Sequence, residues 1–343
     1  MEQTKINQFK HFQSAHCENG VTASLLKNQG IDFLTEPLAF GIGAGLFYIH
    51  LPFMKFSGGP AISFRSMPGT VFSRTCKALE IPLLRKKFND EAKAKLFLDK
   101  LLEENKIAGL QVGVFHLNYL AKEYRFHFNA HNLVVYGKEN DTYLISDPVM
   151  EHVTTLDSET LNKVRFAKGT LAPKGHIYYP KEHSHHISRE TIQKAIAKGI
   201  KTNAFYMTKI PTAFMLGTRG IRYTAGKVKD LKNKMSIKQA GLYLGQIVRM
   251  QEEIGTGGGG FRFMYSAFLE QAYDYVQNDR LLKISEDLTK SGDLWRHNAV
   301  RMAAVFKGRT TEQKHFDEIA EVMVEISHIE EKAFLELGKL KLV

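Results

Sequence analysis

Three residues of the types used in nucleophilic catalysis stand far apart in the chain: Cys17, His131 and Asp147. Catalysis by a thiol needs a thiolate, a base or ion-pair partner, and a group that orients this partner. A cysteine, a histidine and a carboxylate supply these groups in that order. We therefore predict that Cys17 is the nucleophile, that His131 is its base, and that Asp147 fixes the tautomer of the imidazole.

The surroundings of Cys17 predict a reactive thiol. A short apolar run follows it and indicates a helix that Gly30 closes. A thiol in the first turn of a helix lies among unpaired backbone N–H groups, which favour the thiolate. The alternative is a small buried side chain, the ordinary state of a free cysteine. For the oxyanion hole we predict Gln13 together with the Cys17 backbone N–H, with His16 as a rival donor.

A predicted hairpin places the other two residues. Residues 133–136 indicate one strand and residues 143–148 a second. His131 stands at the entrance of one arm and Asp147 at the exit of the other, so antiparallel pairing brings them side by side. Taken singly, His131 also fits a structural strand residue and Asp147 a turn former before Pro148. Their joint placement with a helix-start cysteine favours catalysis.

The chain divides into two parts by its pattern. The first half alternates helical and strand-like segments, and the order of the three candidate residues matches papain-like folds, in which a helix packs its cysteine against a sheet that bears the histidine. A polar linker follows at 180–186, whose histidines lack partners at metal-ligand spacing, so no metal site is predicted. We predict an α+β chain with a papain-like catalytic domain over residues 1–182, in which a helix packs on an antiparallel sheet, followed by an all-α domain over 188–343.

The composition is that of an ordinary globular protein, with 343 residues, 43% hydrophobic and 24% charged. Its two cysteines imply no disulfide framework. The first residues lack the apolar core of a signal peptide, and the longest apolar run, 38–51, is interrupted by glycines and a histidine. That run is too short to span a bilayer. We therefore expect a cytoplasmic protein without a transmembrane segment.

The formal net charge of +11 is unevenly distributed. Residues 194–249 hold twelve Lys or Arg residues against one acid, Asp230. Such a surface attracts nucleic acid, anionic lipid or an acidic protein. No zinc-finger spacing or RNA-binding aromatic signature accompanies it, which disfavours nucleic acid. A solvated basic face without a partner is the alternative.

Two glycine-rich segments interrupt the pattern, at 40–48 and 255–260. The first does not fit GxGxxG and follows a predicted helix, so it suits close packing or the wall of an apolar substrate site. The second opens a helix, where N–H groups can contact an anion, yet it lacks the Lys-Ser/Thr of a P-loop. Tight helix packing is the alternative to ligand contact there. As substrate-binding residues we predict Glu36, Gly43, Gly257, Gly258 and Arg262.

A resemblance to a known family is carried by several of these motifs. They are His16-Cys17-Glu18-Asn19-Gly20, the segment 35–47, and residues 131–137 followed by 146–148. These segments resemble the N-terminal domain of butirosin biosynthesis protein H. Residues 255–262 resemble the uncharacterised helical domain that is often joined to it. The named member of this family transfers an acyl group from an acyl carrier protein to an amine of an aminoglycoside.

The resemblance implies an acyltransferase of specialised-metabolite biosynthesis. It implies that Cys17 accepts an acyl group from a carrier-protein thioester and passes it to an amine or a hydroxyl. The carrier's phosphopantetheine would present the acyl group, and no other cofactor is expected. Carrier proteins are generally acidic, so the basic all-α domain is the expected docking surface or substrate cover. The resemblance does not imply an aminoglycoside acceptor for this chain. A site for an aminoglycoside would need carboxylates, whereas the all-α half of this chain is basic.

Two other functions fit the same residues. A cysteine peptidase or amidase would use the same triad with water as the acceptor, since the triad itself does not separate transfer from hydrolysis. A non-enzymatic binding module would leave the thiol incidental and use the basic helices to hold an acidic partner. The sequence does not identify the acyl chain, the acceptor or the oligomeric state.

Overall fold

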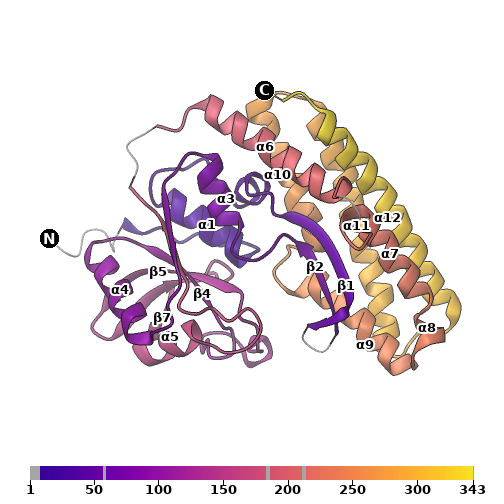
Figure 1. Ribbon diagram of the computed structural model, residues 1–343, viewed down its shortest axis with the longest axis horizontal. Coiled ribbons are helices and arrows are strands. Elements are labelled where there is room, and N and C mark those ends of the chain that lie inside the picture. The colour runs from indigo at the N-terminus through magenta and orange to yellow at the C-terminus, as the bar shows by residue number, and fades with distance from the viewer. Residues whose placement is uncertain (1–7, 57–58, 183–185, 211–213, 343) are drawn as a thin grey trace. The chain divides into compact units, whose positions relative to one another are not determined.

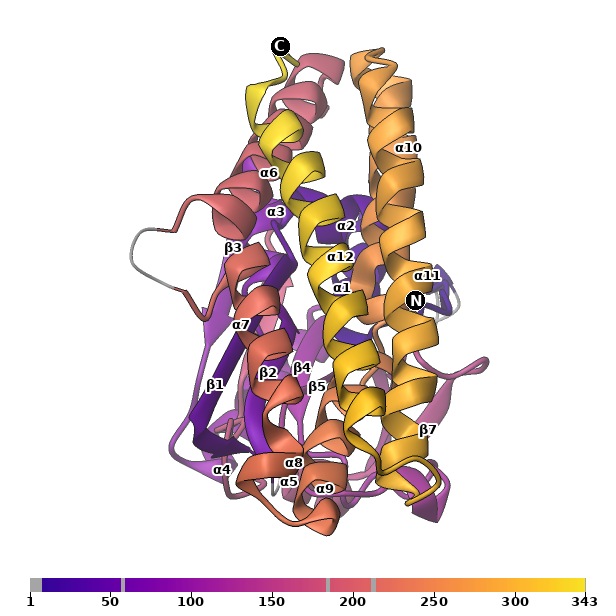
Figure 2. The same cartoon turned by 90° about the vertical axis from the view of Figure 1, so that its right-hand side faces the viewer.

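A computed structural model of the protein describes residues 8–56, 59–182, 186–210 and 214–342 (Figures 1 and 2). The chain packs into two compact units. The first consists of Met1–Ala39 and Pro68–His186, and the second of Phe40–Met67 and Ile187–Val343. Helix α2 (Glu36–Ile42) contains the point where the chain leaves the first unit. The predicted linker at 180–186 lies partly outside the described residues.

The first unit is built on a six-stranded antiparallel sheet with the strand order β3-β8-β4-β5-β6-β7. In chain order the strands are β3 (Leu83–Lys86), β4 (Ala108–Val112), β5 (His131–Glu139), β6 (Thr142–Ser146), β7 (Thr154–Asp157) and β8 (Ile177–Pro180). β5 and β6 form a hairpin in which Val134 pairs with Ser146. His131 begins β5 and Asp147 directly follows β6, so the predicted hairpin is confirmed.

Helix α1 (Cys17–Lys27) packs against β5, β4 and β8. All its residues from Cys17 to Leu26 are buried, which makes it a central helix rather than an amphipathic surface helix. The helix starts at the predicted nucleophile, Cys17. The turn that follows the helix ends at Gly30, whose φ of 87° is a conformation that glycine readily adopts. The remaining helices of this unit are α3 (Val71–Ala78), α4 (Glu91–Glu103), α5 (Ser158–Arg165) and a short 3₁₀ turn at Lys122–Tyr124.

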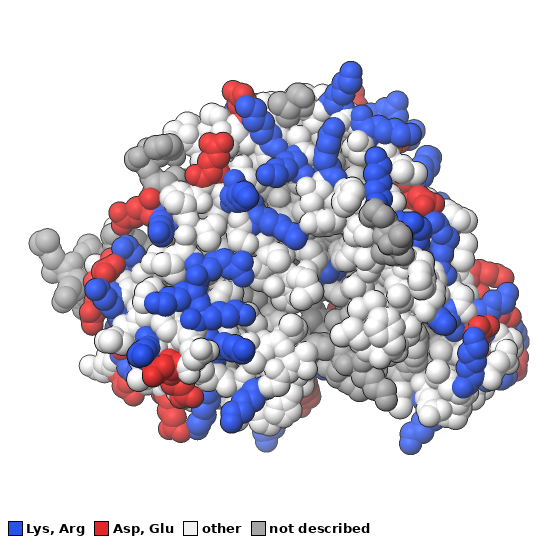
Figure 3. All heavy atoms as spheres, in the orientation of Figure 1, with Lys and Arg blue, Asp and Glu red and all other residues white. Residues whose placement is uncertain are grey.

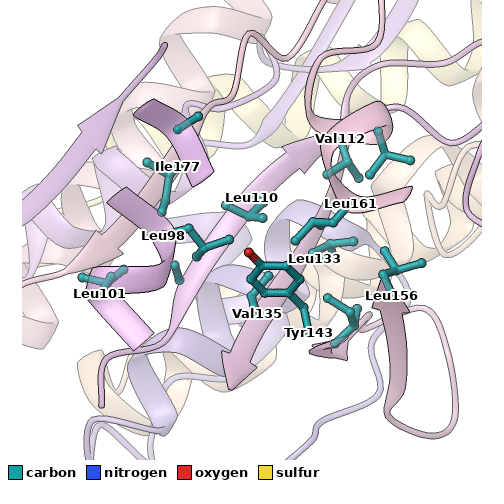
Figure 4. Close-up of a cluster of buried hydrophobic side chains, with 14 of the residues drawn as sticks. Leu98, Leu101, Leu110, Val112, Leu133, Val135, Tyr143, Leu156, Leu161 and Ile177 are labelled. Carbon is teal, nitrogen blue, oxygen red and sulfur yellow. The ribbon is translucent and has the colours of Figure 1, made fainter. Parts of the chain in front are cut away.

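Alternate residues of β5 serve the two faces of the sheet. Leu133 and Val135 join a buried apolar cluster with side chains of α4, α5 and the neighbouring strands (Figure 4). Asn132, between His131 and Leu133, instead reaches Cys17 of α1. The sheet is therefore covered by α4 and α5 on one face and by α1 on the other. A helix that carries its cysteine onto an antiparallel sheet is the papain-like arrangement, and the predicted α+β class is confirmed.

The second unit combines a two-stranded antiparallel ribbon with helices. Its elements are β1 (Leu46–Phe56), β2 (Gly59–Arg65), α6 (Arg189–Thr208), α7 (Gly217–Lys229), α8 (Leu231–Lys234), α9 (Ile237–Val248), the π-helical Arg249–Glu253, the 3₁₀ turn Gly259–Phe261, α10 (Arg262–Val276), α11 (Arg280–Phe306) and α12 (Gln313–Lys339). Figure 2 shows α6, α7, α10 and α12 as long rods of this unit. Within the described residues, no helix is long and apolar enough to cross a bilayer.

The ribbon differs from the sequence-based prediction, which put residues 40–67 in the first domain. The hydroxyl of Tyr48 on β1 donates to Thr224 on α7, and its ring stacks on Trp295 of α11. Phe64 on β2 contacts the same tryptophan edge to face. The buried face of the ribbon thus packs against helices that follow more than 150 residues later in the chain. No local sequence pattern indicates this packing.

Candidate active site

The thiol stands at the first position of α1. His16 caps the helix, since its Nδ1 accepts the N–H of Asn19 at 3.3 Å. Cys17 is 7% exposed. The carboxylate of Glu36 accepts the N–H groups of Ala15 at 2.9 Å and of His16 at 2.7 Å. Burial raises the pKa of Glu36, and these two hydrogen bonds oppose that rise. Glu36, predicted to bind substrate, therefore holds the backbone that leads into the nucleophile.

Two further residues of the 16–20 motif fix the position of α1. The buried Glu18 accepts the N–H groups of Gly69 and Val71, both at 2.9 Å, and so binds α1 to the start of α3. At Gly20, an added Cβ would lie 2.6 Å from the Cβ atoms of Pro148 and Ser14. Only glycine lets the helix approach the loop after β6 so closely. This approach brings the helix N-terminus to Asp147.

His131 and Asp147 form a buried pair. His131 Nε2 donates to Asp147 Oδ2 over 2.6 Å, and the Asp147 side chain is 0% exposed. The same oxygen accepts the hydroxyl of Tyr119 at 2.7 Å, while Oδ1 accepts the Val149 N–H at 3.2 Å. The imidazole of His131 also lies close enough to Cys17 for the two side chains to interact electrostatically. Because Nε2 is taken by Asp147, Nδ1 is the ring nitrogen left for the thiol.

The charges of the site follow from these contacts. Burial by itself would lower the pKa of His131, but the charges of Asp147 and Cys17 and the hydrogen bond to Asp147 raise it well above its usual range. Burial would raise the pKa of Asp147, but His131, Tyr119 and Val149 lower it. The arrangement favours an imidazolium that the Asp147 carboxylate holds beside Cys17. The structure thus brings Cys17, His131 and Asp147 together as predicted.

Three residues beside the site were missed by sequence reasoning. Tyr119 comes from the irregular segment before β5, and burial together with the charge of Asp147 raises its pKa well above the usual range, so it remains a donor. The side chain of Asn132 lies against Cys17, and its Oδ1 accepts the hydroxyl of Tyr178 on β8. Asn132 directly follows His131 in the sequence, which is the single local signal that pointed to it.

The predicted oxyanion donors remain predictions. Gln13 is exposed in the segment that precedes α1. His16 is 4% exposed, and its Nδ1 is engaged in capping the helix. Gly43 is a buried residue of the turn between α2 and β1, in the second unit. Within the described chain, no group of three or more His, Cys, Asp or Glu side chains is placed to hold a metal ion.

The predicted ligand role of Arg262 is corrected by its surroundings. Its side chain is 0% exposed and donates to both carboxylate oxygens of Glu330, at 2.8 Å each, and to the carbonyl of Gly260. The same carboxylate accepts from Ser291 and from the indole of Trp295. An arginine neutralised in this way inside the helical unit is a structural residue.

The glycines before Arg262 serve packing and backbone conformation. Gly257 and Gly258 have φ values of 70° and 86°, which side chains rarely adopt. A Cβ at Gly258 would lie 2.1 Å from the guanidinium of Arg296, and the Gly258 N–H is already bound by Thr256. These contacts favour the packing alternative for Gly258, and the substrate-binding role of Gly257 stays a prediction.

Comparison with protein families assigns both parts of the chain. The model of the domain of unknown function DUF4872 matches residues 159–337, more than half of the chain. The model described as Butirosin biosynthesis protein H, N-terminal, matches residues 16–148. The resemblance carried by the sequence motifs is thereby confirmed, including the separate C-terminal domain. No curated protein matches the chain.

Proposed function

The chain belongs to the DUF4872 family, and with its N-terminal match to a butirosin biosynthesis domain as premise we propose that it is a cysteine-dependent acyltransferase of specialised-metabolite biosynthesis. Cys17 takes an acyl group from an acyl carrier protein thioester and passes it to an amine or hydroxyl. One observation carries this proposal: the thiol at the start of α1 lies beside an imidazole that Asp147 holds at 2.6 Å.

The reaction has two halves with matching proton transfers. In the first, Cys17 Sγ attacks the thioester carbonyl, the bond to the donor sulfur breaks, and the departing thiolate takes the proton of His131. In the second, the amine or hydroxyl attacks the acyl-Cys17 carbonyl and gives its proton to His131. The bond to Sγ then breaks, and Cys17 returns to the thiolate. Asp147 stabilises the imidazolium at the start and end of this cycle.

The donor is proposed to dock on α6. Lys194, Lys198 and Lys201 are exposed on this helix at spacings of four and three residues, which place them on one face together with the 47% exposed Phe205, and the exposed Lys209 caps the end of the helix. Figure 3 shows Lys and Arg side chains gathered over the upper part of the view, where α6 runs in Figure 1. Charges of this sign steer an acidic carrier protein toward the surface and add more to the association rate than to the affinity.

The test is to trap the acyl-enzyme. The full chain is incubated with carrier proteins loaded with acyl groups of different length and polarity, and the peptide containing Cys17 is analysed by mass spectrometry. We expect acylation at Cys17, none in Cys17→Ala, and full acylation in Cys76→Ala. The control is well matched because Cys76 is also buried, and burial raises the pKa of its thiol to about 12.

The outcomes separate the three functions considered. Acyl-Cys17 that is discharged by added amines or alcohols supports the proposal. Discharge by water alone, or rapid peptide cleavage without an added acceptor, indicates a hydrolase instead. An unmodified Cys17 with every donor contradicts acyl transfer, and a biological function that survives Cys17→Ala indicates a binding module.

A further inference from the structure

The side chain of Asn132 occupies a place that neither the triad nor the family resemblance assigns. It is the second residue of β5 and is 2% exposed. Its Nδ2 lies 3.9 Å from Cys17 Sγ and 3.0 Å from the carbonyl oxygen of Ala130. Its Oδ1 accepts the hydroxyl of Tyr178 at 2.8 Å. Both ends of the amide are therefore bound, and one end faces the thiol.

The orientation of this amide is determined by its partners. The carbonyl of Ala130 can only accept, so the NH₂ end of Asn132 must face it. The second N–H of the same nitrogen then points to Cys17 Sγ. The opposite end is necessarily the carbonyl oxygen, which the hydroxyl of Tyr178 satisfies. The amide thus presents a donor, and not an acceptor, to the sulfur.

Three adjacent strands cooperate in this placement. Tyr178 on β8 pairs directly with Gly109 on β4, and β5 lies on the other side of β4. A Cβ at Gly109 would lie 2.5 Å from the Tyr178 ring. Because Gly109 has no side chain, the phenol of Tyr178 has room to cross β4 and reach Asn132. The ring of Phe72 packs on the Tyr178 ring, with 4.8 Å between centroids, and holds it there.

We propose that Asn132 is a further catalytic residue, whose side-chain N–H binds the Cys17 sulfur and stabilises it as a thiolate, and that Tyr178 and Gly109 are its positioning residues. The inference rests on the proposed function in taking Cys17 as the nucleophile. A hydrogen bond to a charged atom is stronger than one to a neutral atom, so this donor favours the thiolate over the thiol.

The same bond acts in both halves of the reaction. It holds the attacking thiolate in the free enzyme, and it weakens when the new carbon–sulfur bond draws the charge away from Sγ. When the acyl group leaves for the acceptor, the negative charge returns to Sγ and the donor is already in place. Asn132 and His131 therefore stabilise the leaving thiolate together.

The test measures alkylation of Cys17 by iodoacetamide, which needs no acyl donor. The rate is followed by mass spectrometry of the Cys17 peptide in the full chain. Near neutral pH we expect Asn132→Ala to react about tenfold more slowly than the natural protein, the factor given by the loss of one hydrogen bond to a charged group. Tyr178→Phe and Gly109→Ala should slow the reaction by a smaller factor, because the donor stays but is no longer held.

A second pH separates thiolate stabilisation from access to the thiol. About pH 10 lies above the ordinary pKa of a free thiol, so there we expect the variants and the natural protein to react at similar rates. The titratable groups whose charge interacts with Cys17 are His131 and Tyr119, with Asp147 behind the imidazole, and none of them is changed. Tyr179→Phe is the matched control, since it alters the next residue of β8, and its rate should equal that of the natural protein.

Each result bears on the inference. Equal rates for Asn132→Ala and the natural protein near neutral pH would overturn it, as would a difference that persists undiminished at about pH 10. If Asn132→Ala does not fold, Tyr178→Phe decides, and an unchanged rate in that variant counts against the inference. Slower alkylation in these variants, together with a Cys17 that no donor acylates in the natural protein, would support the role of Asn132 and contradict the proposed acyl transfer.

Discussion

Replacing Asp147 with asparagine tests the electrostatic reasoning about the triad most directly. The substitution keeps the size of the side chain but removes its charge, which is the largest influence that raises the pKa of His131. The carboxylate accepts three hydrogen bonds in the structure, from His131, Tyr119 and Val149. An amide offers one acceptor oxygen, so at least one of these donors then faces an NH₂ group.

The expected loss is large because both the charge and the tautomer are affected. An amide nitrogen facing Nε2 would favour the tautomer with its proton on Nδ1, which leaves no acceptor for the thiol. For a buried triad the comparable substitution lowers kcat by about 10⁴-fold. We expect a decrease of this size in acyl transfer by Asp147→Asn, measured as release of the carrier thiol under saturating donor.

The same variant should change the pH dependence of stability. The pKa of His131 is raised in the folded protein, so this residue contributes stability below its unfolded pKa that is lost as the pH rises through the folded value. Without the carboxylate the folded pKa falls toward the unfolded one and this contribution shrinks. Breaking a buried ion pair costs about 3–5 kcal/mol. Urea unfolding of Asp147→Asn should show a loss of this order at mildly acidic pH and a smaller loss at alkaline pH.

The control and the refuting result are both specific. Asp141 lies exposed in the turn of the same hairpin, and Asp141→Asn should change neither rate nor stability. A kcat for Asp147→Asn within tenfold of the natural value would refute the role of Asp147 as the group that orients His131. A free energy of unfolding whose difference from the natural protein does not vary with pH would refute the charge argument.

Three further changes test separate contacts. Tyr119→Phe removes one of three donors to Asp147 and should lower kcat about tenfold with little change in Tm, because one hydrogen bond to a charged group is lost; an unchanged kcat would exclude Tyr119 from the site. Gly20→Ala should lower the free energy of unfolding by about 1–3 kcal/mol in urea titrations through its overlap with Pro148, whereas Gly226→Ala, with open space around it, should be neutral or stabilising. Arg262→Met should lower the free energy of unfolding of the second unit by about 3–5 kcal/mol in urea titrations, because it leaves Glu330 buried without its cation. A decrease below about 1 kcal/mol would contradict the structural role given to the Arg262–Glu330 pair.

The parts of the site that could be predicted from the sequence are those set by neighbours along the chain. The hairpin of β5 and β6 needs only two strand patterns around a turn, and it places His131 beside Asp147 within 16 residues. The helix start at Cys17 is similarly local. The link between the two came from the order of the residues and the family resemblance, since nothing in the segment between Cys17 and His131 encodes their proximity.

The parts that could not be predicted depend on strand order and on long-range packing. Tyr178 reaches Asn132 only because β8, β4 and β5 are adjacent and Gly109 lies between them, and strand order cannot be read from periodicity. Arg262 looked like a ligand-binding residue beside glycines because its partner, Glu330, lies 68 residues away on another helix. An isolated arginine gives the same local signal whether a carboxylate inside the protein or a ligand neutralises it.

Two other carboxylates, those of Glu18 and Glu36, belong to the segments that hold Cys17, and both accept hydrogen bonds from the backbone. Glu36 is bound by the backbone N–H groups of Ala15 and His16. Glu18 is bound by those of Gly69 and Val71, where the positive end of the α3 dipole also compensates its charge. Both charges are thus compensated by backbone donors that fix α1 in place.

Asp147 differs from these two in the kind of group that compensates it. Its main partner is a side chain that can carry and release a proton, and that partner also interacts electrostatically with Cys17. The three carboxylates therefore divide into two that build the nucleophile's position and one that controls its protonation. For this reason the loss of Glu18 or Glu36 should appear first in stability, and the loss of Asp147 chiefly in the rate and its dependence on pH.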